Sequence, residues 1–366
     1  MLTGWVGDVK TIDGPGVFLA QFIAPEPPFD RLETLAAWAA EKGFKAVQLP
    51  TFNSGIFDLG KAAESDAYCQ EVQGLLAGHC LVISELSTHR QGHVLGAHSV
   101  YGDVLDAFLP PSVRGNPTAR TAWAKDQLLL AARATQRLGL KRHVTMSGGL
   151  LWPFLYPYPP RPNGLVEEGF AELARRWHPI LDAFDSAGAR VGFELHPGED
   201  LHDGLSFERF LRAVGEHRAA SILYDASHLF LQHIDYAGFL DVYHQRIVAF
   251  HVKDAEWNRS AKTGVYAGYI NWLERAGRFR SPGDGHIDFG LIFSKLTQYD
   301  YSGWASLEWE CCLKHPEDGA REGAQFIRDH IIRVQSRAFD AGMTGTSNPS
   351  RNRKILGLKK TQDGDA

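Results

Sequence analysis

The chain has 366 residues, of which 44% are hydrophobic and 22% are charged, and its formal net charge at pH 7 is -5. This composition is ordinary for a soluble globular protein, and the length is sufficient for a large buried core. The acidic balance gives no electrostatic reason to expect nucleic acid as a partner. We therefore expect a small-molecule ligand.

The first residues and the cysteines predict the compartment. Residues 1–14 contain no basic segment followed by an apolar one, and no apolar run reaches the roughly 18 residues that a membrane span needs. We expect a cytoplasmic protein with no membrane partner. The cysteines show no C-x-x-C spacing, so neither a disulfide framework nor a zinc cluster is predicted. They are Cys69, Cys80, Cys311 and Cys312.

Short apolar or β-branched runs alternate with longer helical patterns along most of the chain. Strands are expected at 17–24, 45–50, 80–86, 142–147, 190–195, 221–225, 246–254 and 303–310. Helices are expected at 30–43, within 117–138, within 165–187, within 206–216 and near 236–244. Asp30 is expected to cap the first helix and Gly43 to end it. The strands lack polar alternation, so the pattern predicts the α/β class and a single (β/α)8 TIM barrel.

Two connections are longer than a simple link requires. Residues 148–164 follow the fourth strand and carry four aromatic side chains among prolines, and residues 255–290 follow the seventh strand. We expect both extended loops to wall a pocket, with local packing on the surface as the alternative. A TIM-barrel catalytic domain is expected over 1–340, followed by a polar, flexible C-terminal tail at 341–366.

Ligand-type side chains stand at the ends of the last four predicted strands. They are Glu194 in FELHPG, Asp225 in LYDASH, His251 in AFHVKD and Glu308 in SLEWE. Because the strands of such a barrel end at one mouth, these side chains should converge there. Three carboxylates would repel one another without a cation, so the set predicts one divalent metal ion, with Mn²⁺ favoured and Mg²⁺, Co²⁺ or Zn²⁺ as alternatives. A single strand-end acid would more simply cap a helix.

Taken in order, these segments resemble the sugar phosphate isomerase/epimerase family of xylose-isomerase-like TIM barrels, which includes the ketose 3-epimerases. The resemblance covers most of the chain and rests on FELHPG, YDASH, FHVKDAE, PGDGHIDF and SLEWE. It implies that the four strand-end residues hold the metal, and that Glu194 and Glu308 also exchange protons with the substrate. It further implies that His228 binds the substrate and that Lys253 and Asp254 shape the pocket floor.

Two residues depart from the family pattern. His196 stands two residues after Glu194, on the same side of the strand, where it is placed to act as a base near neutral pH. The candidate catalytic residues are therefore Glu194, His196 and Glu308. Glu310 shares a face with Glu308, which leaves open which of the two is the metal ligand.

Other polar residues lie near the predicted pocket. Arg280 precedes the glycine-rich turn PGDGHIDFG and is expected to bind a substrate oxygen or, alternatively, a surface acid. Trp152 in the aromatic loop is expected to bind the substrate. Glu85 ends the third strand and is placed to reach the site, whereas His143 begins the fourth strand and is expected to be structural.

The predicted site suits removal of a proton next to the carbonyl of a keto sugar, since a metal stabilises the enediolate while a carboxylate or imidazole moves the proton. Return of the proton gives isomerisation or epimerisation. The alternative is a lyase that eliminates an aglycone, held by residues 148–164, from a 3-keto glycoside, as a resemblance to the catalytic subunits of C-glycoside deglycosidases implies. We expect a homo-oligomer, or a hetero-oligomer with a small subunit if the protein is such a lyase.

Two other functions fit the sequence less well. Phosphodiester hydrolysis of the endonuclease IV kind needs more ligands, for three zinc ions, and a basic face for DNA. A binding module on a degenerate barrel is at odds with four intact ligand-type residues. The fold by itself does not choose among reactions.

Overall fold

The computed structural model describes residues 11–335, 339–340, 343, 345 and 347–358. Eight parallel strands close into a barrel in the order β1, β10, β7, β6, β5, β4, β3, β2. They are β1 (Asp13–Phe18), β2 (Ala46–Pro50), β3 (Val82–Ser87), β4 (Arg142–Thr145), β5 (Arg190–Glu194), β6 (Ala220–Asp225), β7 (Ile247–Val252) and β10 (Trp304–Leu307). The predicted single α/β barrel is confirmed.

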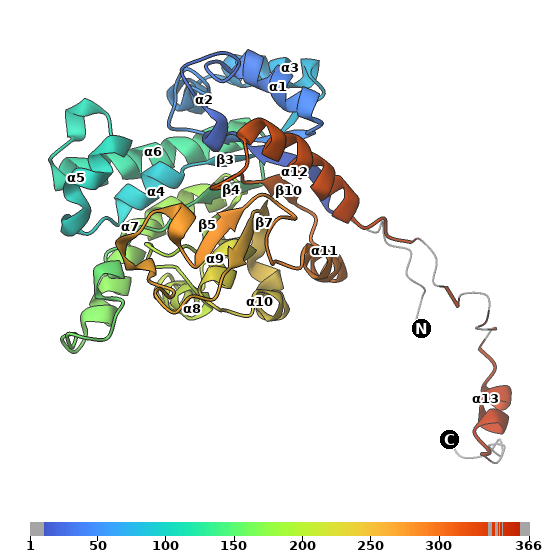
Figure 1. The fold of residues 1–366 in the computed structure, drawn as a ribbon. Helices are drawn as coiled ribbons and strands as arrows, with labels where there is room; N and C mark the ends of the chain where they lie inside the picture. The colour runs from blue at the N-terminus through green and yellow to red at the C-terminus, as the bar shows by residue number, and fades with distance from the viewer. Residues whose placement is uncertain (1–10, 336–338, 341–342, 344, 346, 359–366) are drawn as a thin grey trace. The chain divides into compact units, whose positions relative to one another are not determined.

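Helices lie around these strands (Figure 1). The five predicted ones are present as α1 (Leu32–Lys42), α6 (Pro117–Arg137), α7 (Leu165–Ser186), α8 (Gly204–Ala213) and α10 (Tyr236–Tyr243). Within residues 11–332, seven other α-helices were not predicted: α2 (Leu59–Glu64), α3 (Asp66–Gly78), α4 (His89–Leu95), α5 (Gly102–Leu105), α9 (Ala226–Leu231), α11 (Phe289–Gln298) and α12 (Pro316–His330). The chain between β2 and β4 is therefore more helical than its apolar pattern indicates.

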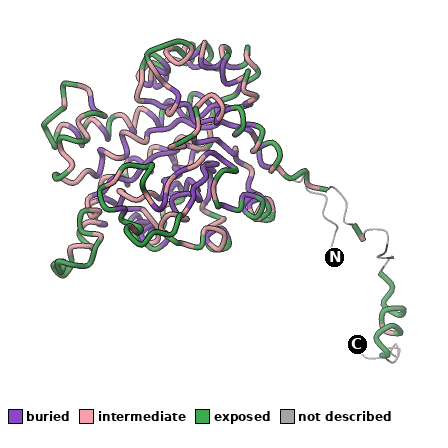
Figure 2. Tube along the Cα trace, in the orientation of Figure 1, coloured by how far each residue is buried: buried purple, intermediate pink, exposed green. Residues whose placement is uncertain are grey.

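The barrel strands are buried on both faces. Every residue of β2, β6 and β7 is buried, which explains why their sequences lack hydrophobic and polar alternation. Figure 2 shows the buried segments gathered in the barrel and the exposed ones on the outer helices and loops. Polar groups at the strand ends are consequently held in a rigid frame that excludes much of the water.

The first strand lies earlier in the chain than predicted. The apolar run 17–24 predicts one strand, but β1 ends at Phe18 and a 3-10 helix, η1 (Leu19–Phe22), follows it. Leu19 and Phe22 are both buried, because a 3-10 turn brings residues three apart onto one side. The sequence stays apolar across this change, so its pattern does not mark the end of the strand.

The two predicted ends of the first helix have different outcomes. The residue before α1 is Arg31, which makes no side-chain cap, so the prediction that Asp30 caps this helix is wrong. Gly43 ends α1 as predicted, with a φ of 94° that a residue without a side chain adopts at little cost.

The connection after β7 contains regular structure that the sequence analysis treated as loop. The predicted strand 246–254 ends earlier, at Val252, and β8 (Asp254–Trp257) pairs antiparallel with β9 (Gly277–Arg280). Between them lie two 3-10 helices, η7 (Ala267–Tyr269) and η8 (Trp272–Glu274). Both Arg278 and Arg280 pair with Glu256 across this hairpin, and these charges hid its strands from a search for apolar runs.

The connection after β4 is held at its start by one carboxylate. Asp200 accepts hydrogen bonds from the backbone amides of Leu150, Leu151 and Trp152, at 2.9, 2.7 and 3.0 Å. A short 3-10 helix, η5 (Trp152–Phe154), begins there. This end of the aromatic loop is therefore fixed to the segment that follows β5.

The chain divides into two units. Residues 11–332 form the barrel unit, and the described residues from Arg333 onwards belong to the other, which contains the helix α13 (Pro349–Ile355). Residues 1–10, and positions 341–342, 344, 346 and 359–366 of the expected tail, lie outside the described part of the chain. Among the helices described, none is both long and apolar enough to cross a membrane.

Candidate metal centre and active site

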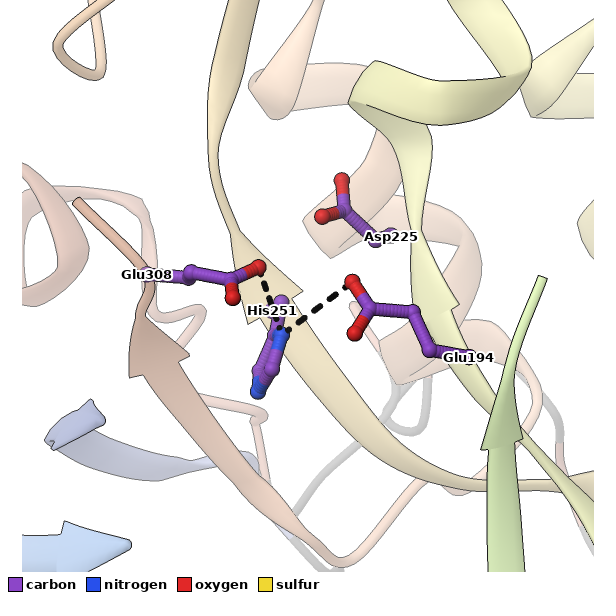
Figure 3. A group of neighbouring side chains, drawn as sticks. All are labelled: Glu194, Asp225, His251 and Glu308. Carbon is purple, nitrogen blue, oxygen red and sulfur yellow. Dashed lines mark hydrogen bonds and ion pairs between the residues drawn. The ribbon is translucent and has the colours of Figure 1, made fainter. Parts of the chain in front are cut away.

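Four ligand-type side chains meet at the ends of adjacent strands. Glu194 and Asp225 are the last residues of β5 and β6, His251 lies in β7, and Glu308 directly follows β10. These strands are neighbours in the barrel, and the pairing of β6 with β7 sets Asp225 opposite His251. Figure 3 shows the four side chains pointing toward a common point. The predicted convergence is confirmed.

This group has the spacing and burial that one cation requires. One ligand atom from each residue lies within 4.8 Å of the other three, and all four residues are buried. Two ligand atoms that each lie about 2.0–2.6 Å from one ion can be no more than about 5.2 Å apart. Within the described chain, Glu194 Oε1 and Asp225 Oδ2 accept no hydrogen bond, although each has an ion pair with a basic side chain, and buried carboxylates of this kind require a cation beside them. The donors therefore fit one divalent ion that prefers oxygen and imidazole.

Lys253 places a buried ammonium group beside these carboxylates. Its Nζ lies 2.7 Å from Glu308 Oε2, 3.0 Å from Asp225 Oδ2 and 3.9 Å from Glu194 Oε1. It also lies 2.9 Å from His228 Nε2. The protein thus supplies part of the positive charge that the group of carboxylates needs.

The electrostatics of the group reflect burial and mutual attraction. Burial disfavours the charged form of His251, but Glu308 and Glu194 outweigh it and raise the pKa of the imidazole to about 10. Burial also opposes the charge on Lys253, yet Asp225 and Glu308 hold its pKa well above the ordinary value. Both shifts have the same cause, a concentration of carboxylates that favours any cation placed among them.

Two glutamines that the sequence analysis did not single out orient the ligand-type residues. Gln21 Nε2 donates to Glu308 Oε1 at 3.0 Å, and Gln48 Oε1 lies 3.1 Å from His251 Nε2. Gln48 Nε2 also donates to Glu85 at 3.4 Å, so Glu85 contacts the site through this amide. Each glutamine is a polar residue within an apolar run, VFLAQFIA or KAVQLP. A polar residue inside such a run could have indicated that its side chain has a role at the site.

His89 is a further residue whose role was missed. Its Nε2 lies 2.8 Å from Glu194 Oε2, and its Nδ1 bonds with the hydroxyl of Ser87 at the end of β3. Its ring stacks on that of His251, with centroids 6.2 Å apart. His89 therefore fixes the outer oxygen of Glu194, and its position just after a strand was the available signal.

A cavity of about 220 Å³ opens beside the group. Glu194, Lys253, Glu308, His196 and Glu310 are among its lining residues, so the carboxylates and the ammonium border open space. Ligand pockets commonly span about 300–1,000 Å³, so this cavity is smaller than most and suits a very small molecule or one part of a larger one.

His196 and Glu310 differ in their relation to the group. The ring centroid of His196 lies 4.0 Å from that of His228, and its Nδ1 lies 2.5 Å from the carbonyl oxygen of Pro197. Burial, together with the nearby His228, holds the pKa of His196 well below its ordinary value. Glu310 is not one of the four converging residues, since its Oε2 contacts Lys253 Nζ at 3.3 Å.

Two predicted substrate-binding residues do not line this cavity. Trp152 packs against His202, with ring centroids 5.4 Å apart, and lines a separate pocket. His228 is fully buried between Lys253 and His196 and does not line the cavity. Their contact with a substrate stays a prediction.

The other two predicted contacts stabilise the hairpin after β7. Asp254 accepts hydrogen bonds from the backbone amides of Gly283 and Gly285, both at 2.9 Å, and Arg280 pairs with Glu256. Neither Asp254 nor Arg280 lines the cavity beside the carboxylates. His143, expected to be structural, is buried and lies 2.7 Å from Thr88 Oγ1.

The fold and the site define a (β/α)8 protein with a candidate metal centre at the mouth of its barrel. The chain belongs to the xylose isomerase-like TIM barrel family, whose match covers residues 36–330.

One curated relative is the inosose dehydratase of Glaesserella parasuis serovar 5 (strain SH0165), 31% identical over 170 residues, which are 44% of this chain and 56% of the relative. The chain spans about half the length of the curated relatives it matches. The 3-keto-D-glucoside 4-epimerase of E. coli has a TM-score of 0.58 at 14% identity, with 86% of this chain and 98% of that one covered. D-allulose 3-epimerase of Methylomonas sp. has a TM-score of 0.56 at 17% identity, with 88% and 98% covered. These two structures share the fold of this chain.

Proposed function

We propose that this protein is a metal-dependent enzyme that removes a proton next to the carbonyl of a keto sugar or sugar derivative, giving isomerisation or epimerisation. The observation that carries the proposal is the converging group of Glu194, Asp225, His251 and Glu308 beside a cavity that His196 lines. A divalent ion held by these four residues, with Mn²⁺ favoured, would supply Lewis-acid stabilisation of the charge that develops on the substrate oxygen.

The residues around the cavity would bind and orient the substrate. Lys253 lies beside Glu308 and Glu310, and its ammonium group would donate to a substrate oxygen in place of its longer contact, the one to Glu310 at 3.3 Å. Arg90 lines the same cavity with its guanidinium held over the ring of Phe52, 3.5 Å from the centroid. Its fork of donors would bind substrate hydroxyl groups.

His196 is the base that we favour. Its lowered pKa keeps the imidazole neutral near pH 7 and a ring nitrogen free to accept a proton, and it also makes this imidazole a weaker base than an exposed one. With Nδ1 donating to the carbonyl of Pro197, Nε2 would be that acceptor. Glu194 and Glu308 are the alternative, although a bound cation makes a carboxylate less basic.

The fate of the carbanion decides the class of reaction. Return of the proton, to the other face or to the neighbouring carbon, gives an epimer or an isomer, whereas departure of a group from the β-carbon gives a lyase. The relatives' names, a dehydratase and two epimerases, describe both outcomes. The alternative function is therefore a lyase that eliminates an aglycone from a 3-keto glycoside, with a small second subunit as the expected partner.

Proton exchange in D₂O tests the proposal directly. The metal-loaded protein is incubated with a panel of ketoses and 3-keto glycosides, and the products are followed by NMR. Deuterium incorporation without cleavage identifies an epimerase or isomerase, and release of the leaving group identifies a lyase. Absence of exchange with every member of the panel would overturn the proposal.

Substitution of His196 tests the assignment of the base. His196→Ala and His196→Gln should lower the exchange rate by about 10²–10⁴-fold while the metal content is retained. His244→Ala is the matched control, because His244 stacks on Tyr299 and does not line the cavity. Near-normal exchange in either His196 variant, or a loss that follows loss of metal, would return proton transfer to Glu194 and Glu308.

A further inference from the structure

A second and larger cavity, of about 570 Å³, adjoins the one beside the converging group. His196 and Glu310 line both, so these two side chains border each space. We call the second space the outer cavity. Its remaining lining residues are Asn271, Trp272, Leu273, Phe279, Cys311 and Cys312.

An aromatic wall leads from the outer cavity to the converging group. The ring of Trp272 packs on that of Phe279, with centroids 4.8 Å apart. The ring of Phe279 in turn lies 4.8 Å from Lys253 Nζ and 5.3 Å from the ring of His228. One end of a ligand would therefore lie near the four ligand-type residues, and the rest of it would lie along this wall.

The wall of the outer cavity is apolar and open. Trp272 and Leu273 are 43% and 52% exposed, so a ligand in the outer cavity can reach both, and the Arg275 guanidinium lies over the Trp272 ring, 4.2 Å from its centroid. Polar groups are present where the two cavities meet, at His196 and Glu310. An apolar wall with polar groups at one end is typical of a site that takes a ring attached through a polar link.

The volumes of the two cavities suggest that the reacting sugar and the rest of the substrate occupy different spaces. The inner cavity, about 220 Å³, is smaller than the roughly 300 Å³ at which ligand pockets usually begin. A substituent on a sugar bound there would reach the outer cavity past His196 and Glu310, which border both spaces. Trp272 and Leu273 belong to the segment between β8 and β9, so the hairpin after β7 builds this part of the wall.

We propose that the outer cavity is a second substrate subsite, which holds a ring joined to the keto sugar, so that the substrate is a glycoside rather than a free monosaccharide. This inference rests on the proposed function for the sugar in the inner cavity. The flat apolar face of the ring lies along Trp272 and Leu273, and the glycosidic link passes between His196 and Glu310. Pyranose and aromatic rings share such a face, and the experiment separates them.

The experiment compares probes that differ only in the substituent. The metal-loaded protein is given methyl and phenyl β-D-glucosides oxidised to the 3-ketone, and the 3-keto disaccharide made from cellobiose, in D₂O. For at least one ring-bearing probe, kcat/KM for proton exchange should exceed that for the methyl probe by about tenfold or more. The probe that is preferred, phenyl or disaccharide, identifies the ring as aromatic or as a second sugar.

Variants of the wall separate the subsite from the chemistry. Trp272→Ala should abolish the preference for the ring-bearing probe while exchange of the methyl probe is retained. Leu273→Trp narrows the outer cavity and should also lower kcat/KM for the ring-bearing probe alone. Thermal melting verifies that both variants fold. Tyr269→Ala is the matched control, since Tyr269 is an exposed aromatic residue of the same segment that does not line the cavity.

Equal kcat/KM for methyl and ring-bearing probes in the unsubstituted protein would overturn the subsite and leave the proposed function standing. An equal loss for all probes in both Trp272→Ala and Leu273→Trp would overturn it in the same way. Saturation-transfer NMR with phenyl β-D-glucoside, which has no ketone and cannot react, tests the subsite independently of exchange. Binding of its phenyl ring that Trp272→Ala removes would support the subsite even if no keto sugar exchanged and the proposed function failed.

Discussion

At the scale of single residues, the ammonium group of Lys253 offsets the repulsion among three buried carboxylates at the strand ends. Lys253→Met leaves Asp225 and Glu308 without their nearest ammonium group, and breaking a buried ion pair costs about 3–5 kcal/mol. A divalent ion would restore part of this compensation. We therefore expect Mn²⁺ to raise the melting temperature of Lys253→Met by more than it raises that of the unsubstituted protein.

The measurement is thermal melting in EDTA and in excess MnCl₂. Lys295→Met is the control, because Lys295 forms an exposed ion pair with Asp241 far from the strand ends. Its response to metal should equal that of the unsubstituted protein. A Lys253→Met protein that melts normally in EDTA would show that the ammonium group does not compensate the carboxylates.

Asp200 makes stability depend on pH. Burial raises its pKa to about 7, against the hydrogen bonds from Leu151 and the neighbouring amides. Because the pKa is higher in the folded state, the stabilising contribution is complete below about pH 4 and is lost as pH rises through 7. Relative to Asp200→Asn, the unfolding free energy of the unsubstituted protein should fall by about 2–3 kcal/mol between pH 5 and pH 8.

Urea unfolding of both proteins at pH 5 and pH 8 measures this difference. Asp288→Asn is the comparison, since Asp288 caps α11 at an exposed position. If Asp200→Asn and the unsubstituted protein changed in parallel with pH, the carboxyl group would not be titrating in this window.

The residues that could be predicted from the sequence are those whose position along a strand determines their place in the barrel. Glu194, Asp225 and His251 follow apolar runs, so period and topology were sufficient to bring them together. Trp152 was different. Its ring packs against His202, and its backbone amide donates to the carboxylate of Asp200, which holds the loop in place. No local pattern encodes a contact that depends on one side chain from another loop.

At the scale of elements, the hairpin after β7 depends on Asp254. Its carboxylate accepts hydrogen bonds from Gly283, Gly285 and Ile287 and from the amide of Ala255. Asp254→Ala leaves these amides without their acceptor, and an unsatisfied buried group costs about 1–3 kcal/mol. We expect the unfolding free energy to fall by about 2–4 kcal/mol, with faster amide exchange at 283–287.

Asp235→Ala provides the comparison for this prediction. Asp235 caps α10 through one amide, so its loss should cost only about 1 kcal/mol and leave exchange at 283–287 unchanged. Equal costs for the two substitutions would mean that the turn is held by other contacts.

The same hairpin shows why some elements were not predicted. Apolar runs reveal strands that are buried on both faces, and all eight barrel strands overlap a predicted run, although β1 shares only Val17 and Phe18 with its run. β8 and β9 instead carry the pairs of Glu256 with Arg278 and Arg280, whose charges interrupt the apolar pattern. The pairing depends on a partner more than twenty residues away, which a local window does not include.

At the scale of the whole molecule, metal binding should be linked to stability. A ligand that binds only the folded state stabilises it by about 2.7 kcal/mol at 100 times its dissociation constant. For the barrel unit, residues 11–332, that corresponds to a rise in melting temperature of about 4 °C, because the unfolding entropy is about 2.1 cal/mol/K per residue. Excess Mn²⁺ should therefore raise the melting temperature of the protein after treatment with EDTA.

The two glutamates of the SLEWE motif allow a more specific test of this prediction. Glu308 lies within the converging group, whereas Glu310 contacts Lys253 beside it. Glu308→Gln should lose most of the Mn²⁺-dependent rise and show a lower metal content by elemental analysis, and Glu310→Gln should keep both. The reverse result would make Glu310 the ligand. A rise that survives both substitutions would place the cation away from the strand ends, because removing an anionic ligand from a site of four must weaken the attraction that holds a divalent ion there.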